Sequence, residues 1–405
     1  MLFLYLLNPF FAWIFSLSKF RDINIFAATW MFVIFFGMTY GLDLESGVDA
    51  IRYIDEIKYL HEVDWDLDWA LQYFSETGEV DLLRIFLAFL VSSFTGNGHI
   101  LMVIYAGIFG YFYAKNLSYI LSKLNGKIKF FTTILLFAFM LIMPFWKIGG
   151  FRFNTGLHVF IYGLLPYVFE NSKRRLVWTF VTPIVFHFAF LLPLAIFLIF
   201  NILGYRIRLY FVLFVLSFIY GQLDLKVFND FLSSISPEAV NERTASYTTE
   251  DKVEAHRSGE YKNYLSWHAR LYKESIKWSL TIYLLVLFYR HKKLILSNPF
   301  FLRLFCISLV YFSVANIMNS IPAGERYYDI SNMLVLAFMI QFYQNHLKDE
   351  YSKRVVKLTL PLILLFVIVS LRESWYHLTL MGIFGNPIVA LIYFGNNTPL
   401  DTFIK

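Results

Sequence analysis

The sequence has little of what soluble enzymes rely on. It contains one cysteine, Cys306, in 405 residues, which excludes a disulfide within the chain and a metal site built from several cysteines. Charged residues make up 16% of the chain, against roughly a quarter in soluble domains. The motifs GxSxG and HExxH, a Walker loop and a glycine-rich dinucleotide turn are also missing. Their absence argues against the hydrolases, zinc peptidases and nucleotide-binding enzymes that use them.

Apolar residues are what the chain has in abundance. Hydrophobic residues reach 58%, aromatic residues 20%, and the mean hydropathy is +0.57. About a dozen apolar runs are long enough to cross a bilayer, or nearly so. These runs lie at residues 2–17, 23–41, 99–116, 130–147, 153–170, 176–189, 189–203, 208–221, 276–290, 301–318, 328–344 and 355–371. We therefore predict an all-α, polytopic transmembrane bundle of about 12 spans in one membrane domain, residues 1–405.

Two apolar stretches have uncertain ends. Pro183 and Pro193 favour a break within residues 176–203, which would otherwise form one long bent helix. The C-terminal stretch 376–395 fits either an interfacial helix or a further span. The first run is followed by basic residues and no small-residue cleavage site, so we interpret it as a span rather than a signal peptide.

Lysine and arginine mark one side of the predicted bundle. They fall in every second short connection, as the positive-inside rule expects for the cytoplasmic side. These connections carry Lys19/Arg21, Lys115/Lys123/Lys127/Lys129, Lys173/Arg174/Arg175, Arg206/Arg208, Arg290/Lys292/Lys293 and Lys348/Lys353/Arg354/Lys357. The alternation requires that residues 82–96 do not cross the membrane, and we interpret them as re-entrant or interfacial. Residues 42–98 then form one extracytoplasmic segment, and residues 222–274 form an extracytoplasmic cap loop.

The first outer segment contains a predicted amphipathic helix. At residues 49–62, apolar and polar side chains recur with helical spacing, which is typical of a helix in the membrane interface. Arg52 and Glu56 are four residues apart and are expected to pair on a solvated face. Alternatively, Asp49 and Arg52 at the helix start face a substrate that enters from the outer leaflet. Both interpretations stay open.

A run of alternating acids follows this helix. Asp64, Asp66 and Asp68 alternate with tryptophan and leucine, and three such carboxylates can hold a divalent cation. An interfacial strip, with aromatic rings among headgroups and acids in water, is the commoner origin of this pattern. Because no neighbouring ligands complete a site, we predict that the protein binds no metal.

A loop between two consecutive predicted spans carries two cations, Lys147 and Arg152. Lys147 is explained by snorkelling to the headgroups. Arg152 begins a span and is a candidate site residue, because charges within a membrane segment are usually functional. Asn154, His158 and Tyr162 recur every four residues after it and share one helix face. Such a polar stripe is expected to face the interior of the bundle.

Two further candidates lie later in the chain. His187 lies between two phenylalanines in a predicted span, where it is either a buried neutral histidine or a proton acceptor, a role that suits histidine side chains in general. Glu325 and Arg326 open a later span from the outside, in a polar patch with Asp329 and Asn332. Arg326 either pairs with Asp329 or contributes to a site, and we favour the site.

By this topology, Arg52, Arg152, Arg326 and His187 meet in the outer half of the bundle. Guanidinium groups bind phosphate oxygens in a bidentate manner, and a diphosphate needs several of them. Nothing else in the sequence suggests a nucleophile beside a base. The sequence therefore predicts a site for a phosphorylated substrate.

Three blocks of the sequence carry a resemblance to a known family. They are GVDAIRY at residues 47–53, the block at residues 151–197 that starts with FRFNTGLH and includes FHF at 186–188, and GERYYDI at residues 324–330. These blocks, together with the number and order of spans, resemble the EpsG-type polymerases of bacterial exopolysaccharide and O-antigen synthesis, relatives of Wzy. The chain departs from the family pattern at Phe153, where a glutamine is usual after the middle arginine.

The resemblance implies a GT-C-like glycosyltransferase of the bacterial inner membrane whose active site faces the periplasm or the cell exterior. Such a polymerase transfers a growing glycan from polyprenyl diphosphate to a hydroxyl of the next lipid-linked repeat, with no cofactor and no metal. The expected partners are the lipid-linked oligosaccharide, membrane lipid, a chain-length regulator and a flippase, and no nucleic acid.

Residue roles follow from the resemblance and the charge pattern together. The diphosphate is expected to be held and stabilised by Arg52, Arg152 and Arg326. The general base is expected to be one of three residues, His187, Asp49 or Glu325. The glycan is expected to contact Asn154, His158, Tyr327, Trp267 and His268.

Two other functions stay open. A GT-C-type glycosyltransferase that uses a polyprenyl-phosphate sugar would also carry an acid in the first outer segment, but would add one sugar rather than many. A flippase for lipid-linked oligosaccharides would have cations along a central cavity and two similar halves. In this sequence the charges gather at one end and the halves differ.

Overall fold

The computed structural model describes residues 2–41, 49–77, 81–219, 254, 256, 266–395 and 398–403. The described helices that precede residue 220 are α1 (Leu2–Leu7), α2 (Pro9–Ser18), α3 (Ile25–Met38), α4 (Asp49–Glu62), α5 (Leu67–Thr77), α6 (Leu82–Ser92), α7 (His99–Ser122), α8 (Phe130–Ile142), η1 (Phe145–Gly150), α9 (Phe151–Glu170), α10 (Leu176–Val185), η2 (Phe188–Phe190), α11 (Leu191–Leu203) and α12 (Ile207–Ile219). The described helices that follow residue 265 are α16 (Trp267–Ser297), α17 (Pro299–Met318), η4 (Gly324–Arg326), α18 (Tyr327–His346), α19 (Glu350–Glu373), η5 (Ser374–Tyr376), α20 (Leu380–Phe384), α21 (Pro387–Ile392) and η6 (Leu400–Phe403).

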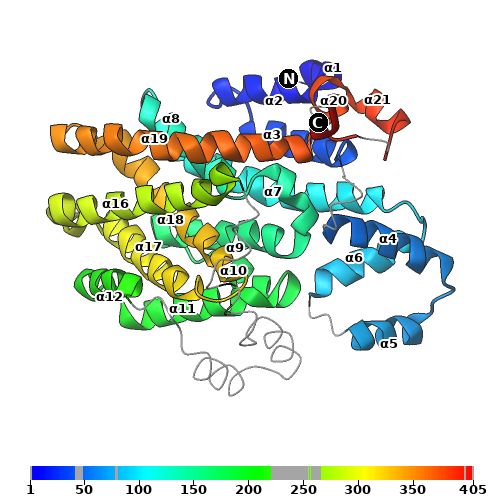
Figure 1. The fold of residues 1–405 in the computed structure, drawn as a ribbon, viewed down its shortest axis with the longest axis horizontal. Helices are drawn as coiled ribbons and strands as arrows, with labels where there is room; N and C mark the ends of the chain where they lie inside the picture. The colour runs from blue at the N-terminus through cyan, green and yellow to red at the C-terminus, as the bar shows by residue number, and fades with distance from the viewer. Residues whose placement is uncertain are drawn as a thin grey trace.

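In the part of the chain that the structure describes, every regular element is a helix, which confirms the predicted all-α class. The long helices lie side by side, whereas α4, α5 and α6 gather at one end of the bundle (Figure 1). Asparagine and aspartate side chains begin several of these helices by accepting a hydrogen bond from the first turn. The capping residues include Asn8, Asn24, Asn298 and Asp349.

Four stretches are long and apolar enough to cross a membrane. They are His99–Ser122, Phe130–Glu170, Pro299–Met318 and Glu350–Tyr376. Several further apolar helices have 10–17 residues. The chain is thus a multi-pass membrane protein, and crossing about 12 times remains a prediction from the sequence.

Helix α18 forms the centre of the bundle. Its side chains are buried without interruption from Ile330 to Gln344, and it packs against α8 and α17. A helix that is covered on all sides lies in the core of a large bundle. Because α18 begins at Tyr327, directly after Arg326, the core helix carries the late polar patch at its N-terminal end.

Close packing of α3 on α7 depends on two glycines. A methyl group at Gly37 would lie 2.4 Å from Cβ of Ala106, and one at Gly110 would lie 2.8 Å from Cβ of Val33. Small residues let helix backbones approach closely where lipid provides no hydrophobic drive between helices. This contact supports the wall of the bundle on which α4 and α6 rest.

The structure answers several questions that the sequence left open. The predicted break in residues 176–203 is confirmed, since α10 ends at Val185 and α11 begins at Leu191. Helix α6 is about 16 Å long, too short for a hydrocarbon core of about 30 Å. The stretch 376–395 forms two helices of five and six residues, each too short to cross the hydrocarbon core on its own. Most of the predicted cap loop 222–274 lies outside the described residues, and its end forms the start of α16.

Candidate functional site

A polar cavity of about 370 Å³ lies where α4, α9, the start of α18 and the break after α10 meet. Its polar lining consists of Asp49, Arg52, Arg152, Asn154, His187, Arg326 and Asp329. The cavity therefore brings together the three arginines and the histidine that the sequence singled out, from four separate segments. What these residues do there remains a prediction.

Arg152 owes its position to an interruption between α8 and α9. Helix α8 ends at Ile142, and η1 separates it from α9, so that Arg152 lies in the first turn of α9. The side-chain nitrogen Nδ2 of Asn154 donates to the carbonyl of Lys147 at 2.7 Å and holds this turn in place. A side chain at Gly150 would collide with that amide, because its Cβ would lie 2.5 Å from Nδ2 of Asn154.

A buried carboxylate, Asp81, contacts both Arg152 and His187. It directly precedes α6, its residue is fully buried, and its Oδ2 accepts a hydrogen bond from Nη1 of Arg152 at 3.0 Å. Its Oδ1 lies 3.3 Å from Nδ1 of His187. Burial raises the pKa of the Asp81 carboxyl, but the contacts with His187 and Arg152 outweigh burial and hold the pKa below its ordinary value. Asp81 is thus an anion that orients a cation and an imidazole.

His187 has an extended backbone conformation and lies between two helices, α10 and η2. Its backbone has φ −163° and ψ 126°, which are not helical values, so the helix is interrupted here. This interruption lies within the stretch 176–203, where a break was predicted. The ring packs edge-on against Phe153 and Phe188. The Nδ1–Oδ1 separation of 3.3 Å is long for a hydrogen bond, and in the described part of the chain neither atom has another hydrogen-bond partner. When Nδ1 carries the proton toward Asp81, Nε2 is the acceptor nitrogen of the ring.

The ion pair expected between Arg52 and Glu56 does not form. Arg52 instead pairs with Asp49 one turn earlier, while Glu56 pairs with Arg84 of α6. The Arg84 side chain is 3% exposed and the Arg52 side chain 69%. An unpaired arginine destabilises the fold far more when it is buried than when water solvates it. Tertiary packing therefore decided that Glu56 pairs with Arg84 rather than with Arg52. The predicted amphipathic helix itself is confirmed, since α4 spans Asp49–Glu62.

Only part of the late polar patch lines the cavity. The guanidinium of Arg326 lies 5.6 Å from the ring centre of Phe153, the residue that replaces the family's usual glutamine. Asp329 lines the cavity, whereas Oε1 of Glu325 lies 3.4 Å from Nζ of Lys273 of α16. Glu325, one of three candidate bases, is therefore not among the residues that line the cavity.

The predicted glycan contacts are distributed unevenly. Asn154 lines the cavity. His158 does not: it is 2% exposed, and its Nε2 hydrogen-bonds the carbonyl of Met143 at 2.9 Å, so it packs in the interior of the bundle. The hydroxyl of Tyr327 donates to the carbonyl of Ala189 at 3.2 Å, outside the cavity lining.

Trp267 and His268 begin α16, again outside the cavity lining. Trp267 is 67% exposed, whereas His268 contacts Ser266 and Arg372. Trp267 is therefore the predicted glycan residue whose aromatic ring is exposed.

Lys147 was attributed above to snorkelling. Its Nζ lies 3.3 Å from Oε2 of Glu373, so this cation has a protein partner.

The alternating acids serve a structural purpose in part. Oδ1 of Asp66 accepts a hydrogen bond from the backbone nitrogen of Trp69 at 2.8 Å at the start of α5. Across the described ranges, no three histidine, cysteine, aspartate or glutamate side chains are grouped closely enough to hold a metal ion. Asp66 is therefore accounted for as a helix-capping residue.

Asp81 was missed by the reasoning from sequence. Its one signal is position: it is the acid that directly precedes an apolar stretch, residues 82–96, in a segment interpreted as re-entrant. A carboxylate carried toward the bundle by such a stretch requires a cationic partner. The sequence contains many candidate partners, and only folding selects Arg152 and His187.

A sequence model of the EpsG family matches residues 28–380, which includes every segment that lines the polar cavity. No curated protein and no protein of solved structure shows significant similarity to the chain.

Proposed function

The chain belongs to the EpsG family of membrane polysaccharide polymerases, and we propose that it joins lipid-linked oligosaccharide repeats at the polar cavity. The donor is a growing glycan on polyprenyl diphosphate, and the acceptor is a sugar hydroxyl of the next lipid-linked repeat. The observation that carries this proposal is the meeting of Arg52, Arg152 and Arg326 in one cavity. Three guanidinium groups from separate segments suit a diphosphate better than a single phosphate or a neutral ligand.

Two of the arginines are oriented by carboxylates. Asp81 holds one nitrogen of Arg152, and Asp49 pairs with Arg52. A guanidinium has five N–H donors in a planar fork, and it can donate to a carboxylate and to phosphate oxygens through different N–H groups. Donors oriented before the reaction stabilise charge that develops on a leaving diphosphate without further reorganisation.

His187 is the base that this arrangement favours among the three candidates. The acceptor hydroxyl oxygen forms the new bond to the anomeric carbon, and the bond from that carbon to the diphosphate oxygen breaks. The hydroxyl proton passes to Nε2 of His187, and the electron pair leaves with the diphosphate. Asp81 stabilises the imidazolium that results, as a carboxylate does beside a catalytic histidine. Asp49 also lines the cavity and is the second candidate, but its carboxylate is engaged with Arg52.

Purified protein in liposomes tests this proposal, with lipid-linked repeats as the only substrate and EDTA present to remove divalent cations. Wild type is expected to produce long chains. Arg152→Ala and Arg326→Ala are expected to lower chain growth by about a hundredfold or more. Arg354→Ala is the matched control, because this exposed arginine belongs to α19 and does not line the cavity. Normal polymerisation by both cavity variants would show that the assigned roles are wrong.

The same assay separates the two alternative functions. A glycosyltransferase that uses a polyprenyl-phosphate sugar has no donor in these liposomes and would leave the repeats unextended. When that sugar is added, it would extend the acceptor by one sugar and would not consume the diphosphate-linked donor. A flippase would move lipid-linked repeats across the liposome membrane without joining them. Product size and transbilayer movement, measured on one preparation, therefore distinguish all three activities.

A further inference from the structure

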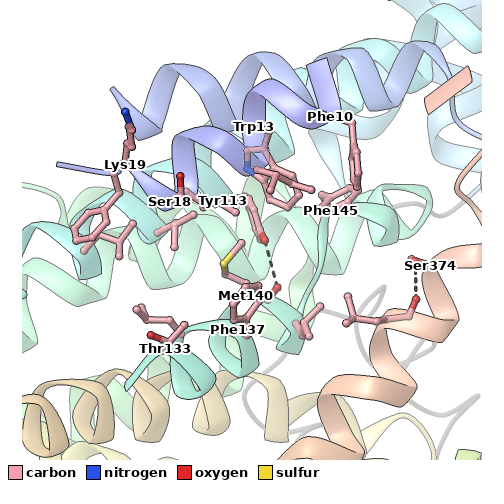
Figure 2. Close-up of a pocket in the computed structure, with 18 of the residues that line it drawn as sticks. Phe10, Trp13, Ser18, Lys19, Tyr113, Thr133, Phe137, Met140, Phe145 and Ser374 are labelled. Carbon is pink, nitrogen blue, oxygen red and sulfur yellow. Dashed lines mark hydrogen bonds between the residues drawn. The ribbon is translucent and has the colours of Figure 1, made fainter. Parts of the chain in front are cut away.

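A second, larger cavity of about 950 Å³ lies between α2, α7, α8 and α19 (Figure 2). Its walls are mostly apolar, with Leu117 of α7, Phe137 and Met140 of α8, and Leu371 of α19 among them. Phe137 and Leu371 are 44% and 45% exposed, so the cavity opens at the side of the bundle. In a membrane protein that side faces lipid chains, and an apolar opening there admits a chain rather than water.

The two ends of this cavity differ in charge. One end contains Lys19, Arg21 and Lys127, with Asp22 as the acid among its lining residues. The other end, near Ser374, carries no charged lining residue, and Figure 2 shows Lys19 and Ser374 at opposite ends. The basic end is the one that the distribution of lysine and arginine places on the cytoplasmic side.

The basic end is held together by a direct contact between two turns. Nη2 of Arg21, which follows α2, donates to the carbonyl of Gly126, which precedes α8. This bond keeps the turn that carries Lys19 beside the turn that carries Lys127. The cations are thus gathered at one end of an apolar cavity, rather than distributed along the cytoplasmic surface.

The length of the cavity suits one leaflet. The lining residues of α2 run from Phe10 to Ser18, which corresponds to about 12 Å of helix, and Lys19 follows directly. Half of a typical hydrocarbon core is about 15 Å. A lipid whose headgroup lies at the basic end can therefore extend its chain along α2 to the middle of the membrane.

We propose that this cavity binds one anionic phospholipid of the cytoplasmic leaflet. Its phosphate lies at Lys19, Arg21 and Lys127, and one acyl chain lies against α7 and α8. Basic side chains at the membrane surface attract anionic headgroups, and the apolar walls hold the chain once the head is placed. The proposal is independent of the polymerase function, since it concerns another cavity and another ligand.

The tail of a polyprenyl diphosphate substrate fits this cavity less well. Its diphosphate belongs at Arg52, Arg152 and Arg326, and the two cavities have no lining residue in common. The charged end of the apolar cavity is also the cytoplasmic end, whereas the substrate presents its diphosphate on the outer side. An anionic headgroup in the cytoplasmic leaflet lies at the same depth as the basic end of the cavity and has the opposite charge.

Native mass spectrometry of the full chain tests the proposal. The protein is reconstituted in nanodiscs of phosphatidylglycerol and phosphatidylcholine in equal amounts, then released into detergent. Wild type is expected to retain one phosphatidylglycerol per chain, with a preference over phosphatidylcholine of about tenfold. Lys19→Gln with Lys127→Gln is expected to abolish this preference without unfolding the protein, because both side chains are exposed.

Lys173→Gln with Lys293→Gln is the matched control. Both lysines are exposed, both lie in predicted cytoplasmic connections, and neither lines the cavity. The control pair is expected to retain the preference of wild type. An equal loss in both double variants would mean that any cytoplasmic cation attracts such lipids, and it would overturn the proposed site.

A photoreactive amino acid at Phe137, on the open side of the cavity, identifies the occupant in the native membrane. The expected adduct has the mass of an anionic phospholipid, and its yield falls in the Lys19→Gln, Lys127→Gln background. A polyprenyl adduct, a zwitterionic lipid in its place, or no lipid adduct would each contradict the proposal. None of these outcomes depends on whether the protein polymerises sugars.

Discussion

Asp81 and Arg152 are separated by 71 residues in the sequence, yet Oδ2 of the first accepts a hydrogen bond from Nη1 of the second at 3.0 Å. Asp81 precedes α6 of the predicted outer segment, residues 42–98, and Arg152 lies in the first turn of α9 of the bundle. The ion pair therefore attaches the outer segment to the bundle at the polar cavity. Because Asp81 also contacts His187, one carboxylate connects the proposed diphosphate site with the proposed base.

The first prediction concerns Asp81 itself. We expect Asp81→Asn to lower the rate of chain extension by between about a hundredfold and ten-thousandfold, because an amide cannot stabilise the imidazolium of His187. Extension of lipid-linked repeats in liposomes measures the effect. Asp66→Asn is the control, since Asp66 is an exposed capping residue in the same outer segment and asparagine caps equally well. Similar losses in both variants would refute a role that is specific to Asp81.

The second prediction separates catalysis from binding at His187. We expect His187→Gln to lower kcat by between about a hundredfold and ten-thousandfold, while KM for the lipid-linked donor changes little. A base acts in the transition state, whereas the arginines hold the diphosphate in both states. Extension rates measured across donor concentrations give both constants. A raised KM at unchanged kcat would place His187 among the binding residues instead.

The third prediction is a pH dependence of stability. The pKa of Asp81 lies below its ordinary value of 3.8 in the folded protein. A carboxyl with a lowered folded pKa stabilises the fold above its unfolded pKa, and this contribution is lost as the pH falls through the folded value. We expect the thermal unfolding midpoint to decline below about pH 5. The decline should be shallower in Asp81→Asn, as unfolding curves in detergent can measure. Parallel curves for the two proteins would show that Asp81 does not contribute.

The fourth prediction contrasts two ion pairs on α4. Glu56→Gln breaks the pair with Arg84, which is buried between α4 and α6, and is expected to destabilise the outer segment by on the order of 3 kcal/mol. Arg52→Ala removes an exposed cation and is expected to change stability little. Limited proteolysis and thermal unfolding measure both effects. Equal stability of the two variants would contradict the importance of the buried pair.

Local pattern alone was sufficient for much of the fold and for part of the candidate site. The amphipathic spacing of residues 49–62 predicted α4, and the prolines predicted a break within residues 176–203, although not that it would fall at His187. Arg152 and Arg326 were identified as candidates because charge is costly next to apolar segments, wherever those segments pack. These inferences need only neighbouring residues, since helical periodicity and local hydropathy are properties of short stretches.

Only the tertiary structure decided which side chains meet. Glu56 lies one helical turn from Arg52 but pairs with the distant Arg84, because a buried arginine requires an anion more than an exposed one does. His158 has the spacing of a cavity residue yet bonds to a carbonyl within the bundle. Asp81 acquires its partners only when α6 folds back onto the bundle. The sequence determined which charges the membrane must accommodate, and packing determined how each is neutralised, because that depends on contacts between distant segments.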